Sequence, residues 1–422
     1  MTKNYNLQSP AKPELMLPAG NLDCLKTAFL YGADSVYVGA PAMSLRARTK
    51  FPIDDLYQGF KIARSHEKKI YFALNIFSKN SDMERLNQSA ELIEDMRPDG
   101  IIVSDPGVFI YLKNRLPDIP LHISTQANVC SSLTAKFWQS LGAKMCVLGR
   151  ETTFLQSLQI KQEVPNLKFE IFVHGAMCIS YSGRCLMSAF MANRSANAGQ
   201  CAHSCRWKYK SKLVLTEELR PQENLEMFED ERGSYIMNSK DLCLMPKLDK
   251  ILAAQFNALK IEGRTKSPYY TAQTARVYRN AIDDYFLNPQ TWSYKPYMDE
   301  LQTLQNRGYT LGFFDGQPDE YAQDYEDTAS KSDWRNAGYI INSSEDFLEI
   351  EICHKLKKGD RVQVLTPFKF KPIDITIDQI YDNLNKCFVD NISAGKPKQS
   401  VKIFAKNLEI FPKHTVMRIK IS

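Results

Sequence analysis

Residues 15–39 read LMLPAGNLDCLKTAFLYGADSVYVG: an apolar run, a helical stretch, a Gly-Ala-Asp turn and a second apolar run. Apolar runs this short and continuous are typical of parallel strands that are buried on both faces of a sheet. A strand, a helix and a second strand in this order form the repeating unit of α/β folds. This stretch therefore predicts a parallel sheet that is covered by helices.

The same pattern recurs along the chain as far as residue 261. The eight apolar runs are Leu15–Leu17, Val36–Val38, Ile70–Leu74, Ile101–Val103, Leu121–Ile123, Cys146–Leu148, Ile171–Val173 and Leu259–Ile261. Eight strands with helices between them is the count of a TIM barrel. We therefore predict a TIM-like (β/α)8 barrel over residues 1–330, with an active-site mouth at the carboxyl ends of its strands.

Two further regions have their own patterns. Residues 176–256, approximately, form a long insertion between the seventh and eighth runs, and a loop of this length is usually functional or has its own structure. Residues 331–422 carry short runs with alternating faces, separated by turns such as Lys358-Gly359-Asp360. They predict a small all-β C-terminal domain, which we take to be a β-barrel.

Composition limits the compartment and the class of protein. Of the 422 residues 44% are hydrophobic, so the chain can bury a substantial core. The formal charge of +6 is consistent with a polyanionic partner but is no evidence for one. There is no apolar stretch of about 18 residues and no signal-peptide pattern, so we expect a cytoplasmic protein without a membrane partner. In that compartment ten cysteines rarely form a disulfide framework.

Four of the cysteines lie close together in the insertion. Cys178, Cys185, Cys201 and Cys205 are separated by six, fifteen and three residues. Four thiolates in one segment suit a zinc ion or an iron–sulfur cluster, and only the second pair has the close spacing of zinc sites. The spacing favours a cluster, while zinc and free thiols stay open. Cys243 is a rival ligand.

Longer motifs carry a family resemblance. The stretch Glu170–Cys178, EIFVHGAMC, is followed by Ser182-Gly-Arg-Cys185, and further motifs are Leu17–Asn21, Met237–Leu242 and Leu259–Ser267. Together they resemble the collagenase-like peptidase family of unassigned catalytic type. The resemblance covers the whole barrel and, more loosely, the C-terminal region.

Two other segments are similar to one branch of that family. Gly199–Tyr209 and Asn306–Phe313 resemble the branch that makes 5-hydroxyuridine at the wobble position of tRNA. The resemblance implies an RNA-modifying enzyme of the oxidoreductase type that needs no molecular oxygen. It also implies a 4Fe-4S cluster on the four cysteines, prephenate as a co-substrate, the tRNA anticodon loop as partner and an electron-transfer partner of unknown identity. Similar proteins often carry a longer stretch in place of residues 210–234. Related members act on another RNA or on a quinone precursor. Another RNA and a quinone precursor therefore stay open as alternative substrates.

Polar residues after the strands are the candidates for the mouth of the barrel. The catalytic candidates are His174, Glu262 and Arg264, and the substrate-binding candidates are Arg46, Arg48, Asn75, Gln126, Arg150 and Lys260. Histidine moves protons near neutral pH, and guanidinium groups pair with carboxylates such as those of prephenate. The same cations suit tRNA phosphates or internal pairs with Glu151 and Glu262, and any of these residues can be an ordinary loop residue.

RNA contacts have candidates of their own. The run Arg206–Lys210 mixes aromatic and basic side chains, which suits stacked bases and phosphates. The lysines at positions 355, 357, 358, 396 and 398 in the β domain are further candidates, and a solvated basic face is the alternative.

A peptidase is the alternative function, and a non-catalytic iron or sulfur carrier is another. The sequence has neither a His-Glu-x-x-His zinc motif nor a Gly-x-Ser-x-Gly elbow. A cysteine protease needs one exposed thiolate rather than four clustered thiols.

Overall fold

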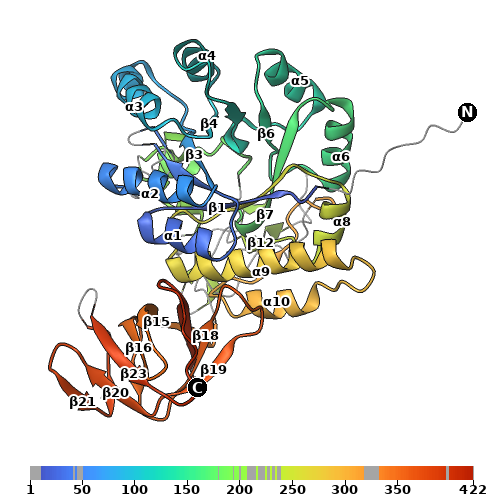
Figure 1. Cartoon of the computed structure of the whole chain (residues 1–422). Coiled ribbons are helices and arrows are strands. Elements are labelled where there is room, and N and C mark those ends of the chain that lie inside the picture. Colours follow the sequence, from blue (N-terminus) through green and yellow to red (C-terminus); the bar gives the residue numbers. More distant parts are fainter. Residues whose placement is uncertain are drawn as a thin grey trace, which may run out of the picture.

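The structure is a computed structural model (Figure 1). It describes residues 11–40, 43–44, 51–178, 180–192, 194–198, 201–206, 239–317, 332–395 and 399–421, and four two-residue strands between 215 and 234.

Eight parallel strands form a closed barrel. Successive strands pair from β1 to β7, and β13 closes the ring by pairing with both β7 and β1. The strands are β1 (Glu14–Pro18), β2 (Ser35–Gly39), β3 (Lys69–Leu74), β4 (Gly100–Val103), β5 (Leu121–Ile123), β6 (Met145–Val147), β7 (Lys168–Ala176) and β13 (Ala258–Ile261). Each of them overlaps one of the eight apolar runs, so the predicted TIM-like barrel is confirmed.

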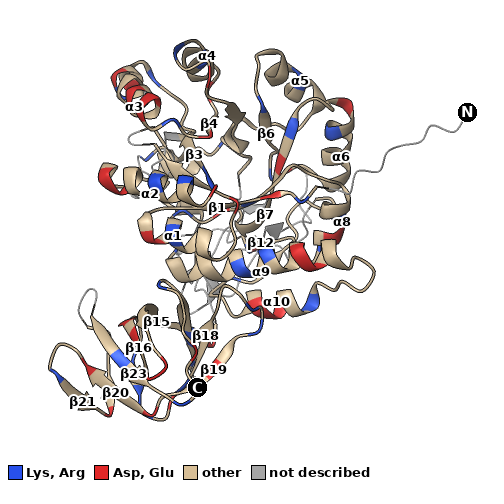
Figure 2. Ribbon diagram, in the orientation of Figure 1, with Lys and Arg blue, Asp and Glu red and all other residues tan. Residues whose placement is uncertain are grey.

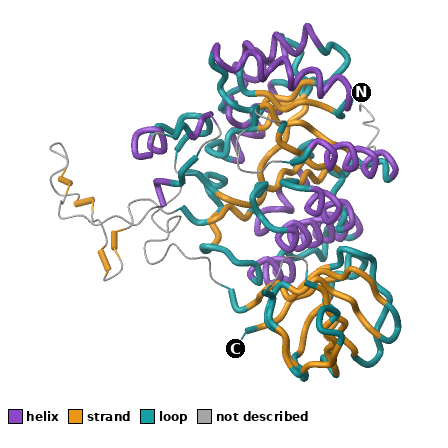
Figure 3. Tube along the Cα trace, turned by 90° about the vertical axis from the view of Figure 1, so that its left-hand side faces the viewer, coloured by secondary structure: helices purple, strands orange, loops and turns teal. Residues whose placement is uncertain are grey.

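Helices follow the strands and surround the barrel (Figures 1 and 3). They are α1 (Leu22–Leu30), α2 (Ile53–Ser65), α3 (Met83–Met96), α4 (Pro106–Arg115), α5 (Ser132–Ser140), α6 (Phe154–Glu163), α8 (Leu248–Ala253), α9 (Pro268–Leu287) and α10 (Lys295–Gln302). Figure 2 shows that both acidic and basic residues occur along the helices α1 to α6.

Polar residues at the strand ends begin several of these helices. Asn21 Oδ1 accepts a hydrogen bond of 2.8 Å from the backbone N–H of Cys24, and Asp105 Oδ1 accepts one of 2.8 Å from that of Gly107. Such N-caps stabilise a helix by about 1 kcal/mol. Both residues are on the loops that follow strands, and the structure gives them a capping role.

The insertion starts from the end of β7. The short strand β12 (Asp241–Cys243) pairs antiparallel with the end of β7, and β14 (Tyr309–Thr310) pairs parallel with β12. Gly175 has φ +116°, and a Cβ there would lie 2.5 Å from the carbonyl oxygen of Glu262, so only glycine fits. The described part of the insertion also contains α7 (Met187–Ala192), the 3-10 turns η3 (Ala196–Ala198) and η4 (Ser204–Arg206), and the two-residue strands β8 to β11.

The C-terminal region is an eight-stranded antiparallel sheet. Its strand order is β19-β18-β24-β15-β16-β23-β20-β21. The strands are β15 (Trp334–Ser343), β16 (Phe347–Ile352), β18 (Arg361–Leu365), β19 (Ile373–Thr376), β20 (Gln379–Asp382), β21 (Cys387–Val389), β23 (Ser400–Phe404) and β24 (Val416–Lys420), with a small pair of β17 (Leu356–Lys357) and β22 (Asn391–Ile392) beside them. The prediction of an all-β region is confirmed, while its closure into a barrel and the boundary at residue 330 stay predictions.

Buried polar contacts join this sheet to the barrel. Tyr31, after α1, donates its hydroxyl to the carbonyl of Leu365 and accepts a hydrogen bond of 3.0 Å from the backbone N–H of Val416. Glu300 on α10 forms ion pairs with Arg276 of α9 and, at 3.0 Å, with Arg418 of β24. One carboxylate thus connects the barrel helices to the sheet. No helix among the described residues is long and apolar enough to cross a membrane.

Candidate functional site

Glu151 fixes the loop between Cys178 and Cys185 to the rim of the barrel. It follows β6, and its two carboxylate oxygens accept hydrogen bonds from the backbone N–H (3.2 Å) and the hydroxyl (3.0 Å) of Ser182. The side-chain amide of Asn128, after β5, also donates to Glu151. The sequence suggested Glu151 as an internal partner for a cation, and in the structure it accepts hydrogen bonds from Ser182 and Asn128.

Gly183 lets the same loop lie directly on the barrel. Its φ is +74°, and a Cβ there would come within 2.1 Å of the carbonyl oxygen of Gln126. Any side chain would therefore push the loop away. The backbone of Gln126, a predicted substrate-binding residue, forms the support for this loop, and the role of its side chain stays a prediction.

Asn197 holds Cys185 from the other side. Its side-chain oxygen accepts from the N–H of Cys185 at 3.3 Å, and its side-chain nitrogen donates to the carbonyl of Cys185 at 3.1 Å. The carbonyl of Asn197 accepts from the N–H of Phe77, beyond β3, at 3.2 Å. Cys185 is thereby tied to two strand ends of the barrel, through Glu151 on one side and Asn197 on the other.

The second pair of cysteines packs against α7. Arg194 donates to the carbonyl of Cys201 at 3.3 Å, and Ser188 Oγ accepts from the N–H of Ala202 at 2.8 Å. The N–H of His203 points at Cys201 Sγ at 3.4 Å.

All four cysteines are free thiols: Cys178 is exposed, and Cys185, Cys201 and Cys205 are half-buried. In number and softness this donor set fits an iron–sulfur cluster. In the described part of the chain no three His, Cys, Asp or Glu side chains are arranged to hold a metal ion. The rival thiol Cys243 is fully buried near Tyr278, and burial raises its pKa to about 12. The ligand role of the four cysteines stays a prediction.

Arg150 lies at the rim of the barrel, against the ring of Phe172. Its guanidinium carbon lies 4.2 Å from the ring centre of Phe172, and Nη1 donates to the carbonyl of Ala176 at 3.0 Å. Its Nε is buried and has no hydrogen-bond partner among the described residues. Arg150 therefore has a buried donor that no acceptor among the described residues satisfies.

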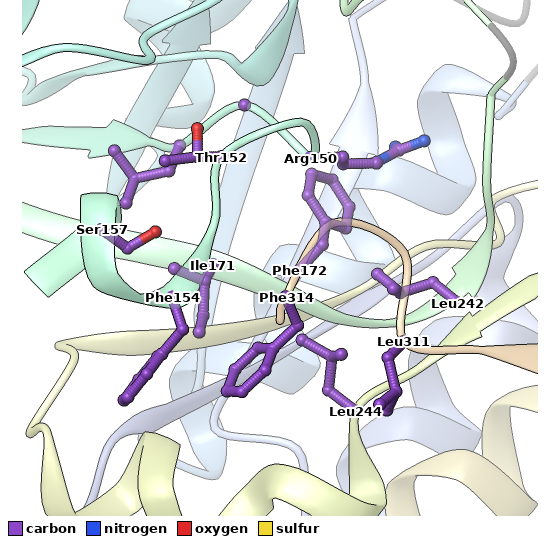
Figure 4. Close-up of a pocket in the computed structure, with 12 residues that line it drawn as sticks. Arg150, Thr152, Phe154, Ser157, Ile171, Phe172, Leu242, Leu244, Leu311 and Phe314 are labelled. Carbon is purple, nitrogen blue, oxygen red and sulfur yellow. The ribbon is translucent and has the colours of Figure 1, made fainter. Parts of the chain in front are cut away.

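A small cavity lies beside Arg150, between β6, β7 and β12 (Figure 4). Its volume is about 40 Å³, and its walls are mostly apolar, with Leu148, Phe154 and Phe314 among them. Figure 4 shows the Arg150 side chain pointing away from Phe154 and Phe314. The cavity has room for about three water molecules. It is too small for a nucleobase or a dicarboxylate.

Lys260 is engaged inside the barrel. Its Nζ lies 3.2 Å from Glu170 Oε2 and 4.3 Å from the ring centre of Tyr37. Lys260 is 4% exposed and Glu170 is fully buried. Burial lowers the pKa of Lys260 and raises that of Glu170, although each group favours the charged form of the other. Lys260 thus has an internal partner, and its predicted substrate contact stays a prediction.

Arg264 and Glu262 follow β13 at the mouth. Arg264 donates to the hydroxyl of Ser44 and lies 5.8 Å from the ring centre of Tyr37. The backbone N–H of Glu262 donates a hydrogen bond of 2.8 Å to the carbonyl of His174, and the side chain of Glu262 is buried. The carbonyl of Asn75 accepts a hydrogen bond of 3.3 Å from Ser104. Their predicted roles stay predictions, and Arg46 and Arg48 are outside the described residues.

His174 lies against the helices rather than free at the mouth. Its ring centre is 6.0, 5.6 and 5.4 Å from those of Tyr270, Tyr278 and Tyr309. It is 2% exposed, and burial lowers its pKa to about 4. The imidazole is therefore neutral at pH 7. In this conformation it is held in an aromatic environment, and its predicted catalytic role is untested.

Residues 20–324 match the sequence profile of Peptidase family U32. The chain belongs to this family. It is 37% identical to "tRNA hydroxylation protein P" of Haemophilus influenzae, over 84% of this chain and 86% of that protein. It is 34% identical to "tRNA hydroxylation protein P1" of Bacillus subtilis, over 97% of this chain and 95% of that protein.

Other relatives of this U32 protein have different names. A "Collagenase" of Porphyromonas gingivalis is 31% identical, over 72% of this chain and 74% of that protein. The solved structure of the U32 peptidase Mk0906 has 14% identity and a TM-score of 0.39, and the alignment covers 61% of this chain and 95% of that one.

Sequence reasoning missed two supports of this U32 site. Glu170 offered a signal, because it is a charged residue directly before the apolar run Ile171–Val173 and lies within β7. Asn197 offered none, because it lies in a loop segment without periodicity and its contacts are with distant parts of the chain.

Proposed function

We propose that this chain hydroxylates the wobble uridine of tRNA at carbon 5, giving 5-hydroxyuridine. The observation that carries the proposal is the similarity to proteins named for tRNA hydroxylation over nearly the whole chain. The four-cysteine segment, anchored at the carboxyl ends of the barrel strands, supports it because active sites of TIM barrels lie at that end.

In this proposal Cys178, Cys185, Cys201 and Cys205 hold a 4Fe-4S cluster. When bound, such a cluster supplies electron transfer or a Lewis-acidic iron. The chain's own contribution is to fix the ligands: Glu151 holds one loop, Asn197 holds Cys185, and Arg194 holds Cys201.

Prephenate is the proposed co-substrate, and the reaction is proposed not to need molecular oxygen. A dicarboxylate needs cationic partners, and guanidinium groups meet carboxylates with good geometry. Arg150 supports this role because its buried Nε has no partner within the described residues. Arg264 follows β13, which is separated from β6 by β7, and is a second candidate.

The tRNA anticodon loop is the proposed partner. Its unpaired bases are the kind of RNA element that proteins recognise by stacking and by hydrogen bonds to splayed-out bases. The predicted contact run Arg206–Lys210 lies mostly outside the described residues. Its role therefore rests on the sequence.

Nucleoside analysis of tRNA from cells that lack this gene tests the proposal. We expect 5-hydroxyuridine and its derivatives to disappear and to return with the intact gene, but not with Cys178→Ala. Cys353→Ala is the matched control, because Cys353 is also exposed but lies in the β domain. Unchanged tRNA, or full restoration by Cys178→Ala, would reject the proposal.

Peptidase activity is the second candidate, because one relative is named a collagenase. Gelatin cleavage by the purified protein that survives replacement of all four cysteines would favour it. The same cells also test the remaining substrates: loss of a modified nucleoside from another RNA, or accumulation of a quinone precursor with normal tRNA, would assign the hydroxylase to those molecules.

A further inference from the structure

One face of the C-terminal sheet carries a row of four aromatic rings. They are Phe347 of β16, Phe404 of β23, Tyr381 of β20 and Phe388 of β21. The strand register places Phe347 opposite Phe404 and Tyr381 opposite Phe388. The ring centres along the row are 6.1 Å (Phe347–Phe404), 5.8 Å (Phe404–Phe388) and 5.2 Å (Phe388–Tyr381) apart. We call these four residues the aromatic platform.

The other face of the same strands is aliphatic and buried. Leu348, Ile350, Ile380, Val401 and Ile403 alternate with the platform residues and form part of the core of the domain. The aromatic rings are therefore not what fills this core. They lie on the solvent side, where Phe388 is 60% exposed and the other three rings are half-buried.

The platform is at the end of the sheet that faces away from the barrel. The barrel contacts run through β18 and β24, by way of Leu365 and Val416. The strand order puts β15 between these strands and the platform strands, and β21 is the outer edge. Figure 1 shows β20 and β21 at the end of the domain remote from α10. Cross-strand aromatic pairs stabilise a sheet, but a contiguous exposed apolar patch is also the usual mark of a binding surface.

Positive charge accompanies the rings. Lys402 Nζ lies 4.5 Å from the ring centre of Phe347, and the exposed Lys386 and Lys406 follow β20 and β23. Over residues 332–422 there are 15 lysines and arginines and 11 acidic residues, so this region carries most of the chain's net charge of +6. Glu349 is on the same face, where it accepts a hydrogen bond of 2.9 Å from Asn383.

We propose that the aromatic platform binds single-stranded RNA. Unpaired bases stack on the rings, with Phe388 the most accessible of them, and Lys402 and Lys386 neutralise the adjoining phosphates. Rings in a row with lysines beside them match the repeating base and phosphate of a single strand, and sheets with exposed aromatic side chains bind RNA in this way. That this RNA is part of the tRNA substrate rests on the proposed function.

Binding of the full chain to a labelled oligouridine and to an unmodified tRNA transcript tests the proposal, with fluorescence anisotropy as the readout. Phe388→Ala should weaken oligouridine binding about tenfold, which is within the range for loss of one stacked base. Phe388→Tyr keeps the ring and should bind like the wild type, whereas Phe388→Leu keeps apolar area only and should bind like the alanine variant. Phe368→Ala is the matched control, because Phe368 is 77% exposed in the same domain but outside the platform.

Salt dependence supplies a second readout. Lys402→Ala should reduce the slope of log affinity against log salt concentration by about 0.7, the value for one phosphate contact on a single strand. A slope equal to that of the wild type would mean that Lys402 makes no contact with an RNA phosphate, which would contradict the proposal.

The proposal would be wrong if the Phe388→Ala, Phe388→Leu and wild-type proteins bound oligouridine with equal affinity. It would also be wrong if Phe368→Ala lost as much affinity as Phe388→Ala. Unchanged RNA affinity together with dissociation of a wild-type dimer in sedimentation would assign the patch to self-association instead. The outcome is separate from that of the proposed function. If Phe388 controls oligouridine binding but deletion of the gene leaves the 5-hydroxyuridine content of tRNA unchanged, only the hydroxylase proposal fails.

Discussion

Lys260 Nζ lies 3.2 Å from Glu170 Oε2 in the interior of the barrel, and both side chains are almost entirely buried. A buried charge that loses its partner is strongly destabilising, whereas removal of both charges costs far less. The free energy of unfolding of variants at these two positions therefore tests whether the two side chains pair inside the barrel.

Replacement of one partner should destabilise the protein by about 3–5 kcal/mol. Lys260→Met leaves Glu170 buried without its cation, and the free energy of unfolding in urea should fall by that amount. The double variant Lys260→Met with Glu170→Leu should recover at least half of the loss. A loss in the double variant equal to the sum of the losses in Lys260→Met and Glu170→Leu would mean that the two side chains do not interact.

Burial of His174 predicts a specific pH dependence. Its pKa is lowered to about 4 in the folded chain, against about 6.5 in the unfolded one. The unfolded state binds more protons between these values, so stability is retained above pH 6.5 and lost as the pH falls towards 4. Between pH 7 and pH 5 this histidine alone should remove about 2 kcal/mol.

The measurement compares the free energy of unfolding of wild type and His174→Gln at pH 7 and pH 5. The variant should lose about 2 kcal/mol less than the wild type over this interval. Identical losses would place the His174 ring in solvent, contrary to its contacts with the three tyrosines.

Glu151 should be required for a stable metal centre if the proposed cluster exists. Glu151→Ala removes the acceptors for both groups of Ser182, which releases the loop between Cys178 and Cys185. After anaerobic reconstitution the iron content per chain should fall by at least half, with an unchanged melting temperature of the β domain. Glu163→Gln, an exposed carboxylate at the end of α6, is the control and should bind iron normally.

Glu300 should couple the barrel to the sheet. It pairs with Arg276 on one side and Arg418 on the other, and these arginines hold its pKa below the usual range although burial opposes the shift. Glu300→Gln should cost about 3 kcal/mol. We expect guanidinium unfolding to separate into two transitions in this variant, and a single unshifted transition would show that the junction depends on other contacts.

Periodicity was sufficient to predict the barrel because buried parallel strands are apolar on both faces. All eight runs, from Leu15–Leu17 to Leu259–Ile261, overlap barrel strands. The same signal does not say which polar residue faces inward. Lys260 was expected at the mouth but pairs with Glu170 inside the barrel, since register around a closed sheet is a property of the whole ring.

His174 shows a second limit. Its closeness in sequence to Cys178 suggested a place beside the cysteines at the mouth. An irregularity in the pairing of β7 with β13, between Lys260 and Ile261, and the added strand β12 accompany its position against α9. Such features depend on tertiary pairing and leave no periodic pattern in the sequence. The contacts of Glu151 and Asn197 depend in the same way on distant loops.

Anaerobic purification, with iron, sulfide and the absorption spectrum measured on one sample, tests the central claim most directly. The account predicts a brown protein with absorbance at about 400 nm and about four irons per chain. Single alanine variants of Cys178, Cys185, Cys201 and Cys205 should lose this signal, and Cys353→Ala should keep it. A colourless wild-type protein loaded with zinc, or a full cluster in all four variants, would contradict the account.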